Sequence, residues 1–82
     1  MNTLDQLLQL LYAAGLPEKE LTMQLGKEWN DIKEEVGIMR ERGWVVSLPP
    51  YLTEVNKGRR FYITPSGRKE FERRVEEGKK AQ

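Results

Sequence analysis

Two residue types that carry much of protein chemistry are missing from this 82-residue chain, which has neither cysteine nor histidine. Without cysteine there are no disulfides and no thiolate metal sites, as is typical of a reducing, intracellular setting. Without histidine, imidazole-bound zinc, Ser-His and Cys-His catalysis and histidine pH switches are excluded. No carboxylate pair or lysine lies in a recognisable catalytic motif either. We therefore expect a protein that is not an enzyme and that needs no metal or cofactor.

Long apolar runs are also missing. No stretch of eighteen apolar residues occurs, and no basic leader precedes the apolar residues 4–14, so the sequence indicates neither a membrane span nor a signal peptide. We expect a soluble, cytoplasmic protein. The length predicts one small domain, residues 1–82, with a narrow stability margin unless a partner chain adds buried surface.

The net charge of +1 hides an asymmetry along the chain. Residues 1–43 carry five Lys or Arg against eight Asp or Glu, whereas residues 44–82 carry nine against five. A local cluster of cations attracts nucleic acid even when the total charge is near zero. The alternative is that these charges only keep a small domain soluble.

The first half of the chain shows a helical period. Two short helices are predicted, one ending at Gly15 and one running from Pro17 to Gly26. A third follows, with apolar residues at spacings of three, four and three: Trp29, Ile32, Val36 and Met39. Gly43 is expected to end it in the left-handed conformation. The second and third helices, about residues 17–43, have the short link of a helix-turn-helix.

After Gly43 the period changes from 3.6 to 2. Residues 44–48 and 60–64 are predicted to be two strands of a hairpin, joined by a polar loop. Thr64 and Pro65 then begin a last helix, about residues 65–78, with a cap and a first-turn proline. The whole pattern predicts an α+β fold that is mainly helical: three helices, a hairpin of about residues 44–64 and a C-terminal helix.

Two junctions suggest a family. They are Met39-Arg40-Glu41-Arg42-Gly43-Trp44-Val45 and Tyr62-Ile63-Thr64-Pro65-Ser66-Gly67-Arg68. With a wing-length loop between them, they resemble the helix-to-strand and threonine-x-x-glycine patterns of winged helix-turn-helix transcriptional regulators of the MarR and PadR type. The resemblance covers nearly the whole chain. It implies a winged-helix domain that binds double-stranded DNA sequence-specifically, as a homodimer paired through its first or last helix.

The resemblance makes the third helix the recognition helix, which enters the major groove of DNA. The candidates for contact with base edges are Asn30, Lys33 and Glu34, with Gly37 beside them. Asparagine pairs with adenine, lysine with guanine, and glutamate accepts a hydrogen bond from cytosine N4. The alternative is that Asn30 caps the helix and that the two charged residues are a solvated face.

In the hairpin, or wing, the resemblance implies contacts with the DNA backbone. Lys57, Arg59 and Arg60 are the candidates, and Arg68 extends this basic patch if the last helix lies close to the wing. The alternative is that these cations protect an edge strand from pairing with other chains.

A second function stays open because the third helix is unusually acidic for a DNA-reading element. It carries Asp31, Glu34, Glu35 and Glu41, and the aliphatic Ile38 lies away from its apolar stripe. A winged helix of this kind could instead bind another protein, with weak or no DNA binding.

Overall fold

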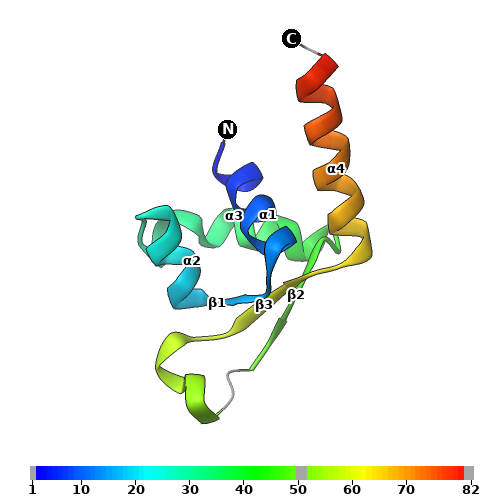
Figure 1. The fold of residues 1–82 in the computed structure, drawn as a ribbon. Helices are drawn as coiled ribbons and strands as arrows, with labels where there is room; N and C mark the ends of the chain where they lie inside the picture. The colour runs from blue at the N-terminus through cyan, green and yellow to red at the C-terminus, as the bar shows by residue number, and fades with distance from the viewer. Residues whose placement is uncertain (1, 50–51, 81–82) are drawn as a thin grey trace.

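The computed structural model describes residues 2–49 and 52–80, which form four α-helices, three strands and one 3-10 helix (Figure 1). In chain order they are α1 (Thr3–Ala13), β1 (Leu16–Pro17), α2 (Glu18–Leu25), α3 (Trp29–Glu41), β2 (Val45–Leu48), the 3-10 helix η1 (Leu52–Lys57), β3 (Arg60–Ile63) and α4 (Pro65–Lys80). The chain has a winged-helix fold that is mainly helical, as the sequence predicted.

One hydrophobic core joins the first three helices to the sheet. Its buried residues come from α1, α2, α3, β2 and β3, and they are Leu7, Leu8, Leu11, Leu21, Ile32, Val36, Met39, Val45 and Phe61. The predicted apolar stripe of the third helix is confirmed, since three of its residues are buried and Trp29 packs against them. Trp29 also stacks on Phe61, with 5.8 Å between the ring centroids.

The sheet differs from the expected two-stranded hairpin. A short strand β1 precedes α2 and pairs antiparallel with β3, so the strand order is β1-β3-β2. Pro17 is therefore the last residue of β1 and the N-cap of α2, and the prediction that it begins the helix was wrong by one residue. A two-residue strand has no periodicity of its own, and only its pairing with Phe61 and Arg60 reveals it.

Glycines in the left-handed conformation end both helices of the helix-turn-helix. Gly26 ends α2 with a φ of 64°, and Gly43 follows α3 with a φ of 75°. At the second site the Gly43 N–H donates to the Arg40 carbonyl and the Trp44 N–H donates to the Met39 carbonyl. These two bonds form a Schellman motif, which confirms the predicted end of the third helix.

The junction between β3 and α4 holds the sheet against the end of α3. Thr64 caps α4 by accepting a hydrogen bond from the Gly67 N–H at 3.0 Å, as predicted. Its hydroxyl also donates to the Gly43 carbonyl at 2.6 Å, and its N–H donates to the Trp44 carbonyl at 2.8 Å. One threonine thus ties the start of α4 to the Schellman turn after α3.

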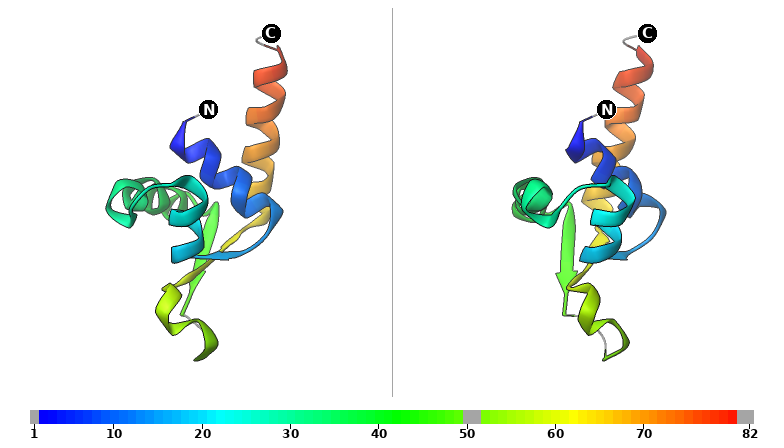
Figure 2. Two further views of the ribbon diagram at one scale, coloured as in Figure 1. Left: turned by 60° about the vertical axis from the view of Figure 1, so that its left-hand side comes forward. Right: turned by 90° about the vertical axis from the view of Figure 1, so that its left-hand side faces the viewer.

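Other boundaries also depart from the sequence prediction. α1 ends at Ala13 instead of at Gly15, and α4 continues through Gly78 to Lys80 instead of ending at about residue 78. The polar loop between β2 and β3 contains η1, which the sequence did not indicate. The wing and the C-terminal half of α4 extend from the body in opposite directions (Figures 1 and 2).

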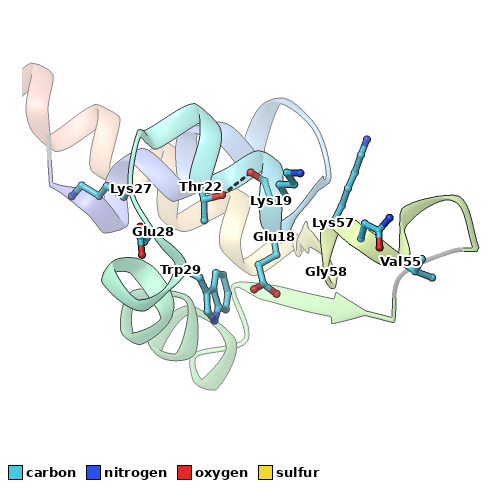
Figure 3. A pocket seen from close by; sticks show the side chains of 10 residues that line it. Glu18, Lys19, Thr22, Lys27, Glu28, Trp29, Val55, Lys57 and Gly58 are labelled. Carbon is cyan, nitrogen blue, oxygen red and sulfur yellow. Dashed lines mark hydrogen bonds between the residues drawn. The ribbon is translucent and has the colours of Figure 1, made fainter.

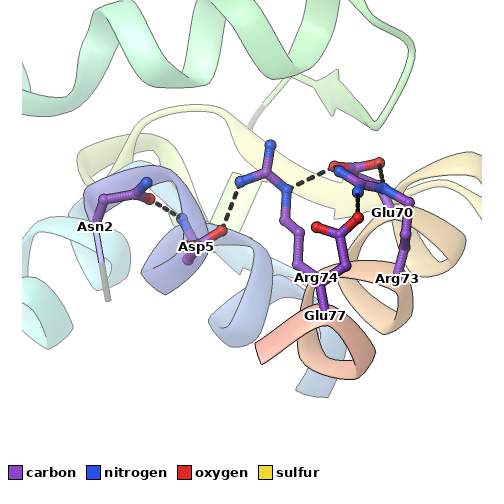
Figure 4. Close-up of polar contacts among 6 residues, drawn as sticks. All are labelled: Asn2, Asp5, Glu70, Arg73, Arg74 and Glu77. Carbon is purple, nitrogen blue, oxygen red and sulfur yellow. Dashed lines mark hydrogen bonds and ion pairs between the residues drawn. The ribbon is translucent and has the colours of Figure 1, made fainter. Parts of the chain in front are cut away.

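One ion pair joins α4 to α1, and others lie within α4 (Figure 4). Arg74 pairs with Asp5 of α1 at 2.7 Å and with Glu70 of α4 at 2.6 Å, and Arg73 pairs with Glu70 and Glu77 within α4. The hydrogen bond from Arg73 and the weaker one from Arg74 lower the pKa of Glu70 to about 2, against the opposing effect of its partial burial.

Candidate nucleic-acid interface

The recognition helix α3 presents three parallel stripes of side chains, because residues three, four and seven apart lie on one side of an α-helix. The buried stripe faces the core. The residues that directly follow those of the buried stripe form a second stripe, which we call the basic side. The residues that follow these in turn form a third stripe, which we call the acidic side. The basic side consists of Asn30, Lys33, Gly37 and Arg40, and the acidic side consists of Asp31, Glu34, Ile38 and Glu41.

The basic side brings together three of the four residues predicted to read bases. Asn30 and Lys33 are exposed in the first half of α3, and Gly37 is half-buried. A Cβ atom at Gly37 would have no heavy atom within 4 Å, so no close packing within the described chain requires the glycine. The fourth predicted residue, Glu34, is exposed on the acidic side.

The helix begins through a local cap that the sequence did not indicate. Glu28 is the N-cap residue, and its N–H donates to the Asp31 carboxylate at 3.4 Å. Asn30 is consequently the second residue of α3, so the alternative that it caps the helix is wrong. Its side chain is available at the solvent-exposed start of the helix.

The wing is fixed to the start of α2. Pro17, the N-cap residue of α2, has no side-chain acceptor for the first N–H groups of the helix. The Glu18 N–H instead donates to the Arg59 carbonyl at 2.8 Å. Gly58 has a φ of 80°, and a Cβ atom there would lie 2.9 Å from the Glu18 Cβ. The end of the wing loop that leads into β3 and the first helix of the helix-turn-helix therefore lie in direct contact.

A cleft of about 660 Å³ lies between the helix-turn-helix and the wing (Figure 3). Trp29 lines it at the start of α3, Lys19 and Thr22 line it from α2, and Lys57 lines it from the wing. In Figure 3 the Trp29 ring points into the cleft, while Lys27 points away, its amino group donating to the Thr3 hydroxyl at 2.8 Å. The cleft thus places the wing beside the side of α3 on which Trp29 lies.

The four predicted wing and backbone residues do not form one patch. Lys57 and Arg59 are exposed on the wing. Arg60 is half-buried in β3, where it donates to the Gly15 carbonyl at 3.1 Å and lies 5.8 Å from the Tyr62 ring centroid. Neighbouring residues of a strand point to opposite faces, which separates this arginine from the one before it.

Arg68 lies in the first turn of α4 and faces α1 rather than the wing. Its guanidinium carbon is 4.6 Å from the Tyr12 ring centroid, and one of its nitrogens is 3.5 Å from the Tyr12 carbonyl oxygen. Arg68 was expected to extend the wing patch only if α4 lies close to the wing. α4 instead extends away from the wing, so this condition is not met (Figure 1).

Sequence reasoning overlooked Arg40 as a member of this surface. It is exposed, and it lies seven residues, or two helical turns, after Lys33 on the same side of α3. That spacing is visible in the sequence. The position of Trp29 at the wing cleft, which gives this side of α3 its interest, depends on the tertiary structure.

No helix within residues 2–49 and 52–80 is both long and apolar enough to cross a membrane. Within the same ranges, no three acidic side chains are grouped so that they could hold a metal ion.

Comparison with known proteins supports the fold. No protein-family model matches this chain, and no curated protein matches it in sequence. Among solved structures, it is similar to a mutant of ZitR from Lactococcus lactis, with a TM-score of 0.78 and 11% identity. The alignment covers 98% of this chain and 53% of that one, so the chain spans about half the length of ZitR. At this identity the similarity shows a shared winged-helix fold.

Proposed function

We propose that this protein binds double-stranded DNA sequence-specifically and acts as a transcriptional regulator in the cytoplasm. The observation that carries the proposal is the position of the cations relative to the wing. Lys33 and Arg40 lie on the side of α3 next to Trp29, and Trp29 lines the cleft whose other wall is the wing with Lys57. One continuous surface can therefore meet both the groove and the backbone of a duplex.

The wing supplies contacts to phosphates. Lys57 and Arg59 are exposed cations on a projecting element, and neither forms an ion pair among the residues that the structure describes. Cations of this kind replace condensed counterions on DNA, which favours binding of any sequence at low salt. The hydrogen bond from the Glu18 N–H to the Arg59 carbonyl joins this part of the wing to α2, the first helix of the helix-turn-helix.

The basic side of α3 supplies the contacts to bases. In the major groove Asn30 would pair with adenine and Lys33 with guanine, while Gly37 leaves room for a base or the backbone to approach. Arg40, two turns further, would contact guanine or a phosphate on the next stretch of the groove. The predicted contact of Glu34 with cytosine stays a prediction, and the proposal does not depend on it.

Homodimerisation through a terminal helix is part of the proposal, since a dimer would place two α3 helices on two half-sites. The apolar surface for such an interface is small on α4, where Val75 is 39% exposed and its described neighbours are mostly charged. Light-scattering mass across a range of concentrations tests this step separately from DNA binding.

The test of DNA binding is fluorescence anisotropy with a labelled random-sequence duplex at 50 and 200 mM salt. If Lys57, Arg59 and Arg40 each contact a phosphate, with a slope of about 0.9 per contact, affinity should fall about 40-fold between these concentrations. Arg59→Ala should weaken binding to every sequence and lower the slope by about one. Lys79→Ala removes the same charge from the exposed end of α4 and is the matched control.

Base reading is tested by selecting preferred duplexes from a random library. Lys33→Ala should change which base is preferred at one position, with a cost of about 1–3 kcal/mol for the preferred sequence. A uniform loss across sequences would restrict Lys33 to a phosphate contact. Absence of binding at 50 mM salt would reject the proposed function.

A further inference from the structure

The acidic side of α3 is the surface of that helix furthest from the core. Its four residues are all exposed, and Ile38 keeps 40% of its accessible surface. By helical geometry the centre of the acidic side lies about 160° around the axis from the centre of the buried stripe. Ile38 thus places an aliphatic side chain, outside the buried core, on the face of α3 that points away from it.

The carboxylates around Ile38 are not neutralised. Glu34, Glu35 and Glu41 form no ion pair with any residue in the described part of the chain. Three cations lie on the same helix or at its end: Lys33 and Arg40 belong to the basic side, and Arg42, four residues after Ile38, has its guanidinium carbon 5.2 Å from the Trp44 ring centroid. The region around Ile38 thus keeps a negative field, which repels DNA phosphates and attracts cations.

We propose that the acidic side binds a basic segment of a partner protein, with one apolar residue of that segment covering Ile38. Lysine or arginine residues flanking the apolar residue would meet Glu34 on one turn and Glu41 two turns later. An amphipathic helix supplies this spacing, since its own apolar and basic residues repeat every three or four positions. The proposal goes beyond DNA binding, which uses the basic side of the same helix.

The area of one helix face makes this a small interface, so the complex should be weak and sensitive to salt. Most of its free energy should come from the apolar contact at the centre, with the charges selecting the partner and its orientation. Because both surfaces lie on α3, a bound partner would also occupy space that DNA needs when α3 lies in the major groove.

The proposal can be tested with a display library of random dodecapeptides selected against the immobilised protein. Enriched peptides should carry a net positive charge and an aliphatic or aromatic residue. A synthetic copy of the most enriched peptide should bind about tenfold more weakly to Ile38→Ser than to the wild type. Met23→Ser is the matched control, because Met23 is 65% exposed on α2, and this variant should bind the peptide as the wild type does.

The charge component has its own variants. Glu34→Gln and Glu41→Gln should each weaken peptide binding severalfold at low salt and less at high salt, whereas Glu76→Gln, an exposed carboxylate on α4, should not. Circular dichroism of each variant confirms that the fold is kept. These substitutions preserve the shape of the side chain, so loss of binding reports the charge.

Three outcomes would overturn the proposal: enriched peptides without a basic bias, peptide binding that survives Ile38→Ser, or a dimer mass that Ile38→Ser reduces to the monomer mass, which would mean that a second copy of this chain covers Ile38. Binding of a random duplex to the same variants separates the two proposals. Failure of the wild type to bind DNA, with basic peptides still binding through Ile38, would reject the DNA function and keep this one.

Discussion

Gly67→Ala tests whether the junction between β3 and α4 holds the wing on the body. Gly67 is buried in the first turn of α4, directly over the backbone of the turn that follows α3. A Cβ atom at this position would overlap the Trp44 carbonyl oxygen and lie 2.7 Å from the Ile63 Cγ1. Backbone atoms cannot rotate away as a flexible side chain can, so α4 or the turn must shift.

The size of the effect follows from three contributions. Forcing an extra methyl group into a packed site costs about 1–3 kcal/mol. Displacing the Trp44 carbonyl also weakens its hydrogen bond from the Thr64 N–H, which contributes about 1 kcal/mol. Alanine regains about 1 kcal/mol through its higher helix propensity. The net loss should be about 1–3 kcal/mol, a large part of the stability of a domain of this size.

Urea denaturation followed by circular dichroism measures this loss, with Gly78→Ala as the control. Gly78 also lies in α4, but a Cβ atom there would have no heavy atom within 4 Å, so alanine should stabilise the protein by up to about 1 kcal/mol. Opposite signs for the two variants are expected. A Gly67→Ala protein as stable as the wild type would refute the argument that close approach requires glycine here.

Three further predictions concern the core, the sheet and the response to acid. Met39→Ala, at a fully buried position of α3, should lower the free energy of unfolding by about 2–5 kcal/mol in the same assay. Arg60→Ala should lower stability by about 1 kcal/mol through loss of its bond to Gly15, unlike Arg59→Ala; equal stability of the two variants would contradict the orientation of Arg60 toward the sheet. Because the pKa of Glu70 is lowered to about 2 in the folded state, its ion pairs stabilise the protein above the unfolded pKa of about 4, and this contribution is lost as the pH falls toward 2. Glu70→Gln should therefore flatten the dependence of stability on pH between about 5 and 2, and an unchanged pH profile would show that the ion pairs do not contribute.

The sequence by itself determined the elements whose signals are local. The apolar spacing of α3, the left-handed Gly43, the Thr64 cap and the alternation in the hairpin each depend on residues within a few positions, so each could be read without the structure. The same reasoning correctly placed Trp29 in contact with the core and left Ile38 exposed.

Only the tertiary structure decided what depends on residues far apart in the chain. β1 exists because Leu16 meets Phe61, and Gly67 is required because Trp44 passes next to it. The division of α3 into a basic and an acidic side was present in the spacing of its residues. The stacking of Trp29 on Phe61 and its position in the wall of the wing cleft followed only from the tertiary packing, because no local pattern encodes those contacts.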